Sequence, residues 1–127
     1  MDENQLSAVI VDCSIEVQRT LGGPGLLESV YEEALAWELR GRGFAVERQL
    51  LLPITYKGTI LAAPLRLDLV VEGKVIIECK ATAEYSDLFE AQALTYLRIA
   101  KLKLALVINF GEKYVGKTGV HRVVNKL

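Results

Sequence analysis

The sequence has few of the residues that form disulfide frameworks, thiolate or imidazole metal centres and histidine-based catalytic sites. Its 127 residues include two cysteines, Cys13 and Cys79, and one histidine, His121. Two cysteines are too few for a disulfide framework and lack metal-ligand spacing, so we expect two reduced, buried thiols. A lone histidine in a glycine-rich tail argues against a role in a metal site or a catalytic triad.

Long apolar runs, a signal peptide and a surplus of basic residues are also absent. No apolar run approaches the length of a membrane span, so we expect a cytoplasmic protein with no membrane partner. The net charge of −1 argues against strong non-specific binding of nucleic acid, although it leaves room for a local basic patch. A glycine-rich phosphate loop followed by Lys-Ser or Lys-Thr is missing, which counts against an ATPase.

The chain has enough apolar residues, 51%, for a folded core, and its length suits one domain over residues 1–127. Helical periodicity predicts helices over about 4–20, 26–40 and 85–101. Short apolar or alternating runs predict strands over residues 44–56 with a bend at Pro53, 59–62, 65–72, 74–81, 104–110, 113–115 and 120–124. This order indicates an α/β domain in which helices flank a mixed sheet.

The most informative segment is a predicted β-hairpin that turns at Gly73. Its odd-numbered positions are apolar apart from the turn, whereas its even-numbered positions carry charges toward one end. Keeping the odd positions in the core requires pairing about Gly73. That register sets Asp68 opposite Glu78 and Arg66 opposite Lys80, with Cβ atoms about 5 Å apart within each pair.

Two carboxylates this close repel each other unless a cation lies between them or one of them is protonated. A hard divalent ion such as Mg²⁺ prefers carboxylate oxygens and water, so it is the simplest cation to expect. The alternative is a solvated face on which Arg66 and Lys80 neutralise the acids. Val70 and Ile76 on the same face argue against a uniformly wet surface.

Three other polar residues suit the same site. Glu28 lies in the first turn of the second predicted helix, where it either interacts with the helix dipole or supplies a third carboxylate. Gln92 and Tyr96 are four residues apart and share one face of the third helix. A glutamine within an apolar stripe needs hydrogen-bond partners, which a metal ligand, a bound water or Lys80 could supply. Otherwise Gln92 is a packed boundary residue and Tyr96 a core residue.

These residues carry a family resemblance. Asp68 followed by Glu78-Cys79-Lys80 resembles the D-x(n)-E-x-K core of the PD-(D/E)XK nuclease superfamily. The run Gln92–Tyr96 (QALTY) resembles the QxxxY element of its exonuclease-like branch. The run Gly25–Tyr31 (GLLESVY) is similar to the motif that defines the GxxExxY protein family. The proline that often precedes the aspartate is replaced by a leucine.

The resemblance implies a restriction-endonuclease-like mixed sheet flanked by helices and a site that uses Mg²⁺ or Mn²⁺. Carried over by position, it implies that Asp68, Glu78 and the carbonyl of Cys79 bind the metal, with Glu28 as a candidate third carboxylate. Lys80 would orient or help to activate the attacking water. The residues implied to support the site or touch the substrate are Gln92, Tyr96 and Arg66.

Two main functions are open at this point. The first is a metal-dependent nuclease that hydrolyses phosphodiester bonds of DNA or RNA. The second is a non-catalytic interaction module that keeps the nuclease fold, for which a homodimer is a plausible form because one small domain offers little surface to grip a duplex. A hydrolase of small phosphorylated substrates is a third, weaker hypothesis.

Overall fold

The computed structural model describes all 127 residues. The elements in chain order are α1 (Glu3–Leu21), α2 (Glu28–Gly41), β1 (Val46–Leu52), β2 (Thr55–Tyr56), β3 (Thr59–Ile60), β4 (Leu65–Val71), β5 (Val75–Lys80), α3 (Leu88–Ala100), β6 (Leu104–Asn109), the short π-helix η1 (Val115–Gly119) and β7 (Val120–Val124). None of the helices combines the length and apolar character that crossing a bilayer requires.

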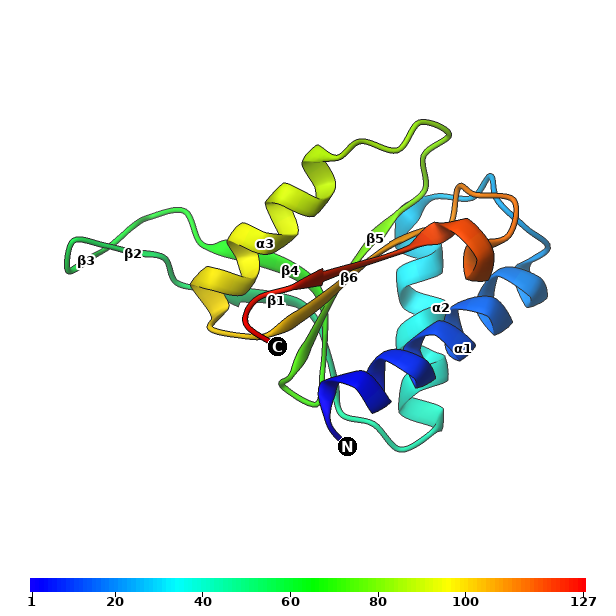
Figure 1. Cartoon of the computed structure of the whole chain (residues 1–127), viewed down its shortest axis with the longest axis horizontal. Coiled ribbons are helices and arrows are strands. Elements are labelled where there is room, and N and C mark those ends of the chain that lie inside the picture. The colour runs from blue at the N-terminus through cyan, green and yellow to red at the C-terminus, as the bar shows by residue number, and fades with distance from the viewer.

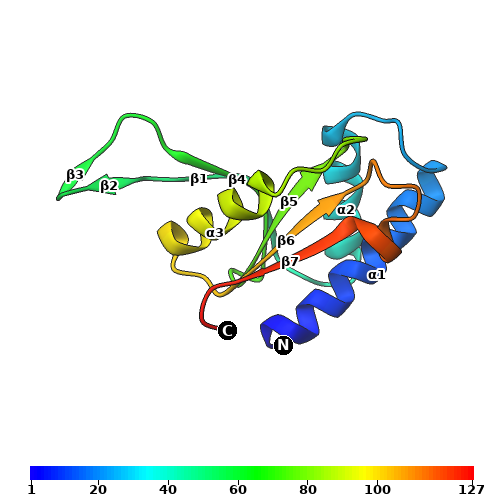
Figure 2. The ribbon, with the colours of Figure 1, turned by 45° about the horizontal axis from the view of Figure 1, so that its top comes forward.

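Five strands form a mixed sheet in the order β1-β4-β5-β6-β7. Strands β5 and β6 run parallel, and the other neighbours are antiparallel. Helices α1 and α2 cover one face of the sheet and α3 covers the other (Figure 1). The small β2–β3 hairpin forms the tip of an arm that projects past α3 (Figure 2). The predicted mixed sheet flanked by helices is confirmed.

Local sequence signals set where the first two helices begin and end. The Asp2 side chain accepts the N–H of Gln5 at 2.8 Å, and the Gln5 side chain accepts the N–H of Asp2 at 2.9 Å, which completes a capping box. Gly22 ends α1 with a φ of 99°, a conformation that glycine adopts at no steric cost. Helix α2 begins at Glu28, two residues later than predicted, so Glu28 is its first residue.

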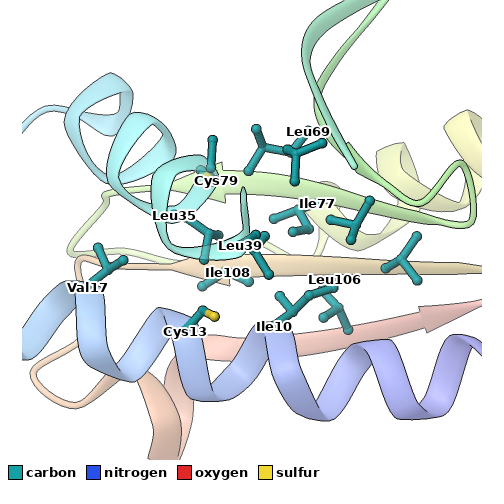
Figure 3. Packing of buried hydrophobic residues seen from close by; sticks show 14 of the residues in the cluster. Ile10, Cys13, Val17, Leu35, Leu39, Leu69, Ile77, Cys79, Leu106 and Ile108 are labelled. Carbon is teal, nitrogen blue, oxygen red and sulfur yellow. The ribbon is translucent and has the colours of Figure 1, made fainter. Parts of the chain in front are cut away.

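The central sheet is buried on both faces, which corrects the expectation that each strand of the charged hairpin has one buried face. On the side of α1 and α2, the larger core cluster includes Ile10, Leu35 and Ile77 (Figure 3). On the side of α3, a second cluster contains Val70 and Ile76. These are the two apolar residues on the charged face of the hairpin, so the charged end borders an apolar layer.

The predicted register of the β4–β5 hairpin is confirmed from the turn as far as the pair Leu69↔Ile77, where the ladder ends, so the predicted pairs Asp68–Glu78 and Arg66–Lys80 are not ladder partners. The backbone partners Leu69↔Ile77 and Val71↔Val75 are placed symmetrically about Gly73, which has a φ of 63° in the turn. Because this φ lies in the left-handed region, glycine is the residue best suited to the position.

The long strand predicted over 44–56 is wrong. Strand β1 ends at Leu52, directly before Pro53, and β2 is a separate strand that pairs with β3. Proline cannot donate to a sheet ladder, which explains why the strand stops there instead of bending. The turn between β2 and β3 falls at Lys57-Gly58, as the sequence predicts.

The strand predicted over 113–115 is also wrong, whereas the strand over 120–124 is confirmed as β7. The N–H of Val115 donates to the buried side-chain oxygen of Gln18 at 2.8 Å. This hydrogen bond to α1 replaces the strand partner that the segment would need. The segment therefore forms a loop that leads into η1.

Gly111 lies where the loop after β6 touches the segment after β5. A Cβ atom at Gly111 would lie 2.3 Å from the backbone oxygen of Thr82 and 2.6 Å from its nitrogen. We predict that Gly111→Ala lowers the free energy of unfolding by about 1–3 kcal/mol, the usual cost of overpacking a close contact. Gly41→Ala is the matched control, because a Cβ atom there meets nothing within 4 Å.

Urea unfolding of the wild type and of both variants measures this effect. We expect a lower midpoint for Gly111→Ala and little change for Gly41→Ala. Equal midpoints for the two variants would contradict the close contact between the loops.

Candidate active site

The site forms where β4 and β5 separate. Their ladder ends at the pair Leu69↔Ile77. Beyond it, β4 pairs with β1 alone and the last residues of β5 pair with β6 alone. The Asp68 carboxylate fills the opening and accepts the N–H of Cys79 at 2.9 Å. The register therefore brings Asp68 beside the end of β5.

Asp68 and Glu78 form a close carboxyl pair. Glu78 is only 6% exposed, and the Asp68 carboxyl group lies beside it, held by its hydrogen bond to the N–H of Cys79. Burial and the neighbouring charge of Asp68 raise the pKa of Glu78 to about 9. Its Oε1 atom is buried and has no hydrogen-bond partner. The pair thus holds a proton at neutral pH and keeps one oxygen without a partner.

Lys80 lies at the end of β5 and is half-buried. Its backbone carbonyl accepts the N–H of Phe110, which extends the β5–β6 ladder. Its Nζ lies 4.6 Å from the centre of the Phe89 ring, a favourable position for a cation over an aromatic face. Phe89 contacts Tyr85 edge-on at 5.3 Å, and Tyr85 stacks on His121 at 3.8 Å. Three aromatic rings therefore support the amine of Lys80 from the side of α3.

Helix α2 brings Glu28 to the opposite side of the same strand end. Burial of its carboxyl group raises the pKa of Glu28, whereas Lys80 and the backbone amide of Ala81 lower it. The charge of Asp68 also raises this pKa. Although Glu28 as a residue is exposed, these interactions show that its carboxyl group faces the end of β5.

Glu32 is a site residue that the sequence analysis missed. It lies one helical turn after Glu28, is 5% exposed, and binds Arg48 at 3.0 Å and Gln49 at 2.8 Å. Burial raises the pKa of Glu32, and the hydrogen bond from Arg48 lowers it. The sequence signal that could have identified Glu32 is its spacing of four residues from Glu28, which puts both carboxylates on one face of α2.

Strand β1 is irregular at the residue opposite Asp68. Gln49 has a φ of 51°, and the β1–β4 ladder omits the pair that these two residues would form. The two residues that flank Asp68 in β4 pack on opposite faces of the sheet: Leu67 on the α3 side and Leu69 on the α2 side. A non-glycine residue in this conformation costs free energy and is common at functional sites. Nothing in the sequence signals it.

Tyr96 approaches the carboxyl pair from α3, and Gln92 lies next to Tyr96. Burial raises the pKa of the half-buried Tyr96, as do the charges of Glu78 and Asp68, and a hydrogen bond with Gln92 lowers it. Gln92 itself is exposed, so the expectation of a buried amide is wrong. Arg66 is also exposed; the ladder ends before it could pair with Lys80.

Asn109 fixes the loop that follows the site, and the sequence analysis missed it. It is fully buried and lies beside Lys80 in the parallel β5–β6 register. Its side chain accepts the N–H groups of Thr82 and Gly111 and donates to the carbonyl of Thr82. The sequence signal that could have identified Asn109 is its polar side chain near the end of the apolar run 104–110.

The residues fit a divalent cation bound by the carboxyl pair, although no group of three or more His, Cys, Asp and Glu side chains converges as a ready-made ligand set. The unpartnered Oε1 of Glu78 and the raised pKa of its carboxyl group beside Asp68 mark a position where a cation would relieve repulsion. Cys79 contributes its backbone to the site. Its thiol is fully buried, and burial raises the pKa of that thiol, so it is not a nucleophile.

Taken together, a mixed five-stranded sheet and an acidic pair followed by a lysine define a restriction-endonuclease-like α/β protein. A family comparison matches residues 4–123 to the PD-(D/E)XK nuclease superfamily, and the chain belongs to this superfamily. Its nucleases generally use divalent metals. No curated protein and no solved structure matches the chain significantly.

The carboxyl pair predicts how stability depends on pH in the metal-free protein. Folded Glu78 keeps its proton to about pH 9, whereas its ordinary pKa is 4.5. Between these values the folded state binds more protons than the unfolded state, so stability falls as the pH rises from about 4.5 to about 9. We predict that Glu78→Gln removes this decline and has a higher Tm than the wild type at pH 8, with a smaller difference at pH 5.5.

Thermal unfolding in the presence of a chelator, at several pH values, measures this dependence. Glu47→Gln serves as the control because Glu47 is exposed on β1, and its pH profile should follow that of the wild type. Parallel profiles for Glu78→Gln and the wild type would show that Glu78 is not protonated in the folded state.

Proposed function

We propose that this protein is a metal-dependent nuclease that hydrolyses phosphodiester bonds of DNA or RNA, and that residues 1–127 form one nuclease domain. The observation that carries the proposal is the buried Asp68–Glu78 pair, with one oxygen of Glu78 free of any partner and Lys80 two residues further on β5. If these buried acids had a purely structural role, their oxygens would have hydrogen-bond partners or apolar residues would stand in their place. Membership of the nuclease superfamily supports the same function.

In this proposal Asp68 and Glu78 hold Mg²⁺ or Mn²⁺, with the carbonyl of Cys79 and the carboxylate of Glu28 as further candidate ligands. The bound ion would polarise the phosphodiester and lower the pKa of a water molecule. The charge of Glu28 beside Ala81 makes it the carboxylate best placed to complete the set from α2.

Lys80 supplies positive charge where the transition state gains negative charge. Its contact with the Phe89 ring leaves its ammonium free of a carboxylate partner, since it forms no salt bridge. The raised pKa of Tyr96 keeps its hydroxyl protonated, so it can donate to a phosphoryl oxygen or to Glu78. Gln92 orients that hydroxyl, and exposed Arg66 is placed to contact a phosphate further along the substrate.

We also propose membership of the GxxExxY branch, because the motif residues have defined structural roles. Gly25 has a φ of 111°, which favours glycine. Glu28 begins α2 and faces the end of β5. The Tyr31 ring stacks on Phe110 with ring centres 4.7 Å apart, and its hydroxyl donates to the carbonyl of Gly23 at 2.7 Å. The motif thus holds the loop that delivers Glu28.

A specific observation favours a second candidate, an interaction module that forms a homodimer. Apolar side chains are exposed directly before α2, on α2 and on the projecting arm: Leu27 is 75% exposed, Trp37 71% and Ile60 69%. Exposed apolar patches mark interaction surfaces. A dimer is also compatible with a nuclease, so cleavage decides between the two functions.

Lys80→Ala should strongly slow cleavage without unfolding the protein, because Lys80 is half-buried and its replacement takes a single charge from the site. The measurement is cleavage of linear, branched and single-stranded DNA and RNA with Mg²⁺ or Mn²⁺. Removing one such electrostatic interaction typically slows the reaction by about 10²–10³-fold. Lys103→Ala, in an exposed lysine next to β6, is the matched control and should cleave like the wild type.

Equal cleavage by the wild type and Lys80→Ala would contradict the site and indicate a contaminating nuclease. A folded wild type that cleaves no substrate on the panel would favour the interaction module.

A further inference from the structure

An open pocket of about 660 Å³ lies on the surface, away from the β2–β3 arm. It is bordered by the second half of α1, the glycine loop that precedes α2 and the segment that follows β6. Its lining includes Ile15, Arg19, Pro24, Lys113, Tyr114 and Lys117. We call it the Tyr114 pocket. Its size falls within the range of ligand-binding pockets, and none of these residues belongs to the candidate active site.

The walls of the Tyr114 pocket are fixed by a buried side chain of α1. Gln18, which is 6% exposed, donates to the carbonyls of Phe110 at 3.2 Å and Glu112 at 2.7 Å. It also accepts the N–H of Val115 at 2.8 Å. Because a buried amide is costly without partners, these three bonds hold the segment 110–115 in one position.

Tyr31 fixes the opposite wall. Its hydroxyl donates to the carbonyl of Gly23 and accepts the N–H of Leu26 at 3.2 Å, while its ring stacks on Phe110. The same tyrosine therefore connects both walls to the core. In Figures 1 and 2 the glycine loop before α2 and the loop after β6 lie side by side at one end of the sheet.

The chemistry of the Tyr114 pocket suits a planar aromatic group with a negative charge. Tyr114 is 55% exposed, and the Nζ atoms of Lys113 and Lys117 lie 5.5 and 5.0 Å from its ring centre. Neither lysine has a carboxylate partner, whereas Arg19 is paired with Glu16 at 2.8 Å. Of the nearby acids, Glu112 accepts the hydroxyl of Thr118. Two lysine amines without a carboxylate partner thus lie over the ring of one exposed tyrosine.

The position of the Tyr114 pocket connects it to the candidate active site. Tyr31 follows Glu28 by one helical turn on α2. Gly111 is bonded to Asn109, which lies beside Lys80 in the sheet. One of the two loops that form the pocket therefore leads into α2, which carries Glu28, and the other follows β6, whose last residue lies beside Lys80.

We propose that the Tyr114 pocket binds a nucleotide of single-stranded nucleic acid that flanks the scissile phosphodiester. The inference rests on the proposed nuclease function. A base stacks on Tyr114, and Lys113 and Lys117 contact the adjacent phosphates, the combination by which proteins hold single strands without reading their sequence. A duplex keeps its bases stacked on one another, so it does not offer a base to Tyr114.

Fluorescence anisotropy with a short labelled oligo-dT and an oligo-U, in the presence of a chelator, tests this proposal. Tyr114→Ala should weaken binding by between about 5- and 150-fold, the range for removal of one base–aromatic stack. Tyr114→Phe keeps the ring and should bind like the wild type. Replacing Lys113 and Lys117 with alanine should reduce the slope of log K against log salt by about 0.7 for each phosphate that the variant no longer neutralises.

Tyr56→Ala is the matched control. Tyr56 is 59% exposed and has the amine of Lys57 5.5 Å from its ring centre, but it belongs to β2, which lies at the tip of the projecting arm, far from α1 and the loop before α2 (Figure 2). Its removal should leave binding of the oligonucleotides unchanged. A similar weakening in Tyr56→Ala and Tyr114→Ala would show diffuse binding and overturn the proposal.

Other outcomes also decide it. The proposal would be overturned if the Tyr114→Ala variant bound the oligonucleotides as tightly as the wild type does, or if the wild type did not bind them. It would also be overturned if the wild type bound a mononucleotide as tightly as an oligonucleotide, or preferred a duplex. Cleavage of the same oligonucleotides with Mn²⁺ is measured in a separate experiment, so a failure of the pocket proposal can be distinguished from a failure of the nuclease proposal. Tyr114-dependent binding without cleavage supports the pocket and contradicts the nuclease, whereas cleavage and binding unaffected by Tyr114→Ala contradict the pocket alone.

Discussion

The separation of β4 from β5 beyond the Leu69–Ile77 pair is the constraint on which the rest of the site depends. When one strand leaves its partner, the freed backbone groups need other hydrogen bonds. The Asp68 carboxylate provides one of them by accepting the N–H of Cys79. This bond fixes Asp68 next to Glu78. The same side chain therefore pairs a freed backbone group of the sheet and forms the acidic pair.

The acidic pair is unfavourable for the metal-free protein and useful for a cation. Burial and mutual repulsion keep a proton on Glu78, and its second oxygen has no partner inside the protein. The surroundings hold this arrangement in place: α2 supplies Glu28, and the aromatic ring of Phe89 supports Lys80. The site is thus charged, partly dry and preorganised, the conditions under which electrostatic stabilisation of a transition state is strongest.

Much of this fold was predictable from periodicity, and the hairpin register followed from the parity of apolar residues about Gly73. The residues missed have causes that no local pattern carries. Gln49 has a left-handed backbone conformation and donates to Glu32 on α2, and Asn109 acts through a loop far away in sequence. Gln92 was expected to be buried but is exposed, because helical spacing shows which residues share a face and not how deeply each of them is buried.

The most direct test of the central claim is calorimetric titration of Mn²⁺ into the protein at pH 7, repeated in buffers with different ionisation enthalpies. If the Asp68–Glu78 pair holds both the proton and the metal, binding should release about one proton per ion, because a carboxyl ligand must be deprotonated. Glu78→Gln should lose that release and most of the affinity, whereas Glu47→Gln should behave like the wild type. Metal binding without proton release, or binding unchanged in Glu78→Gln, would place the metal elsewhere and contradict the account.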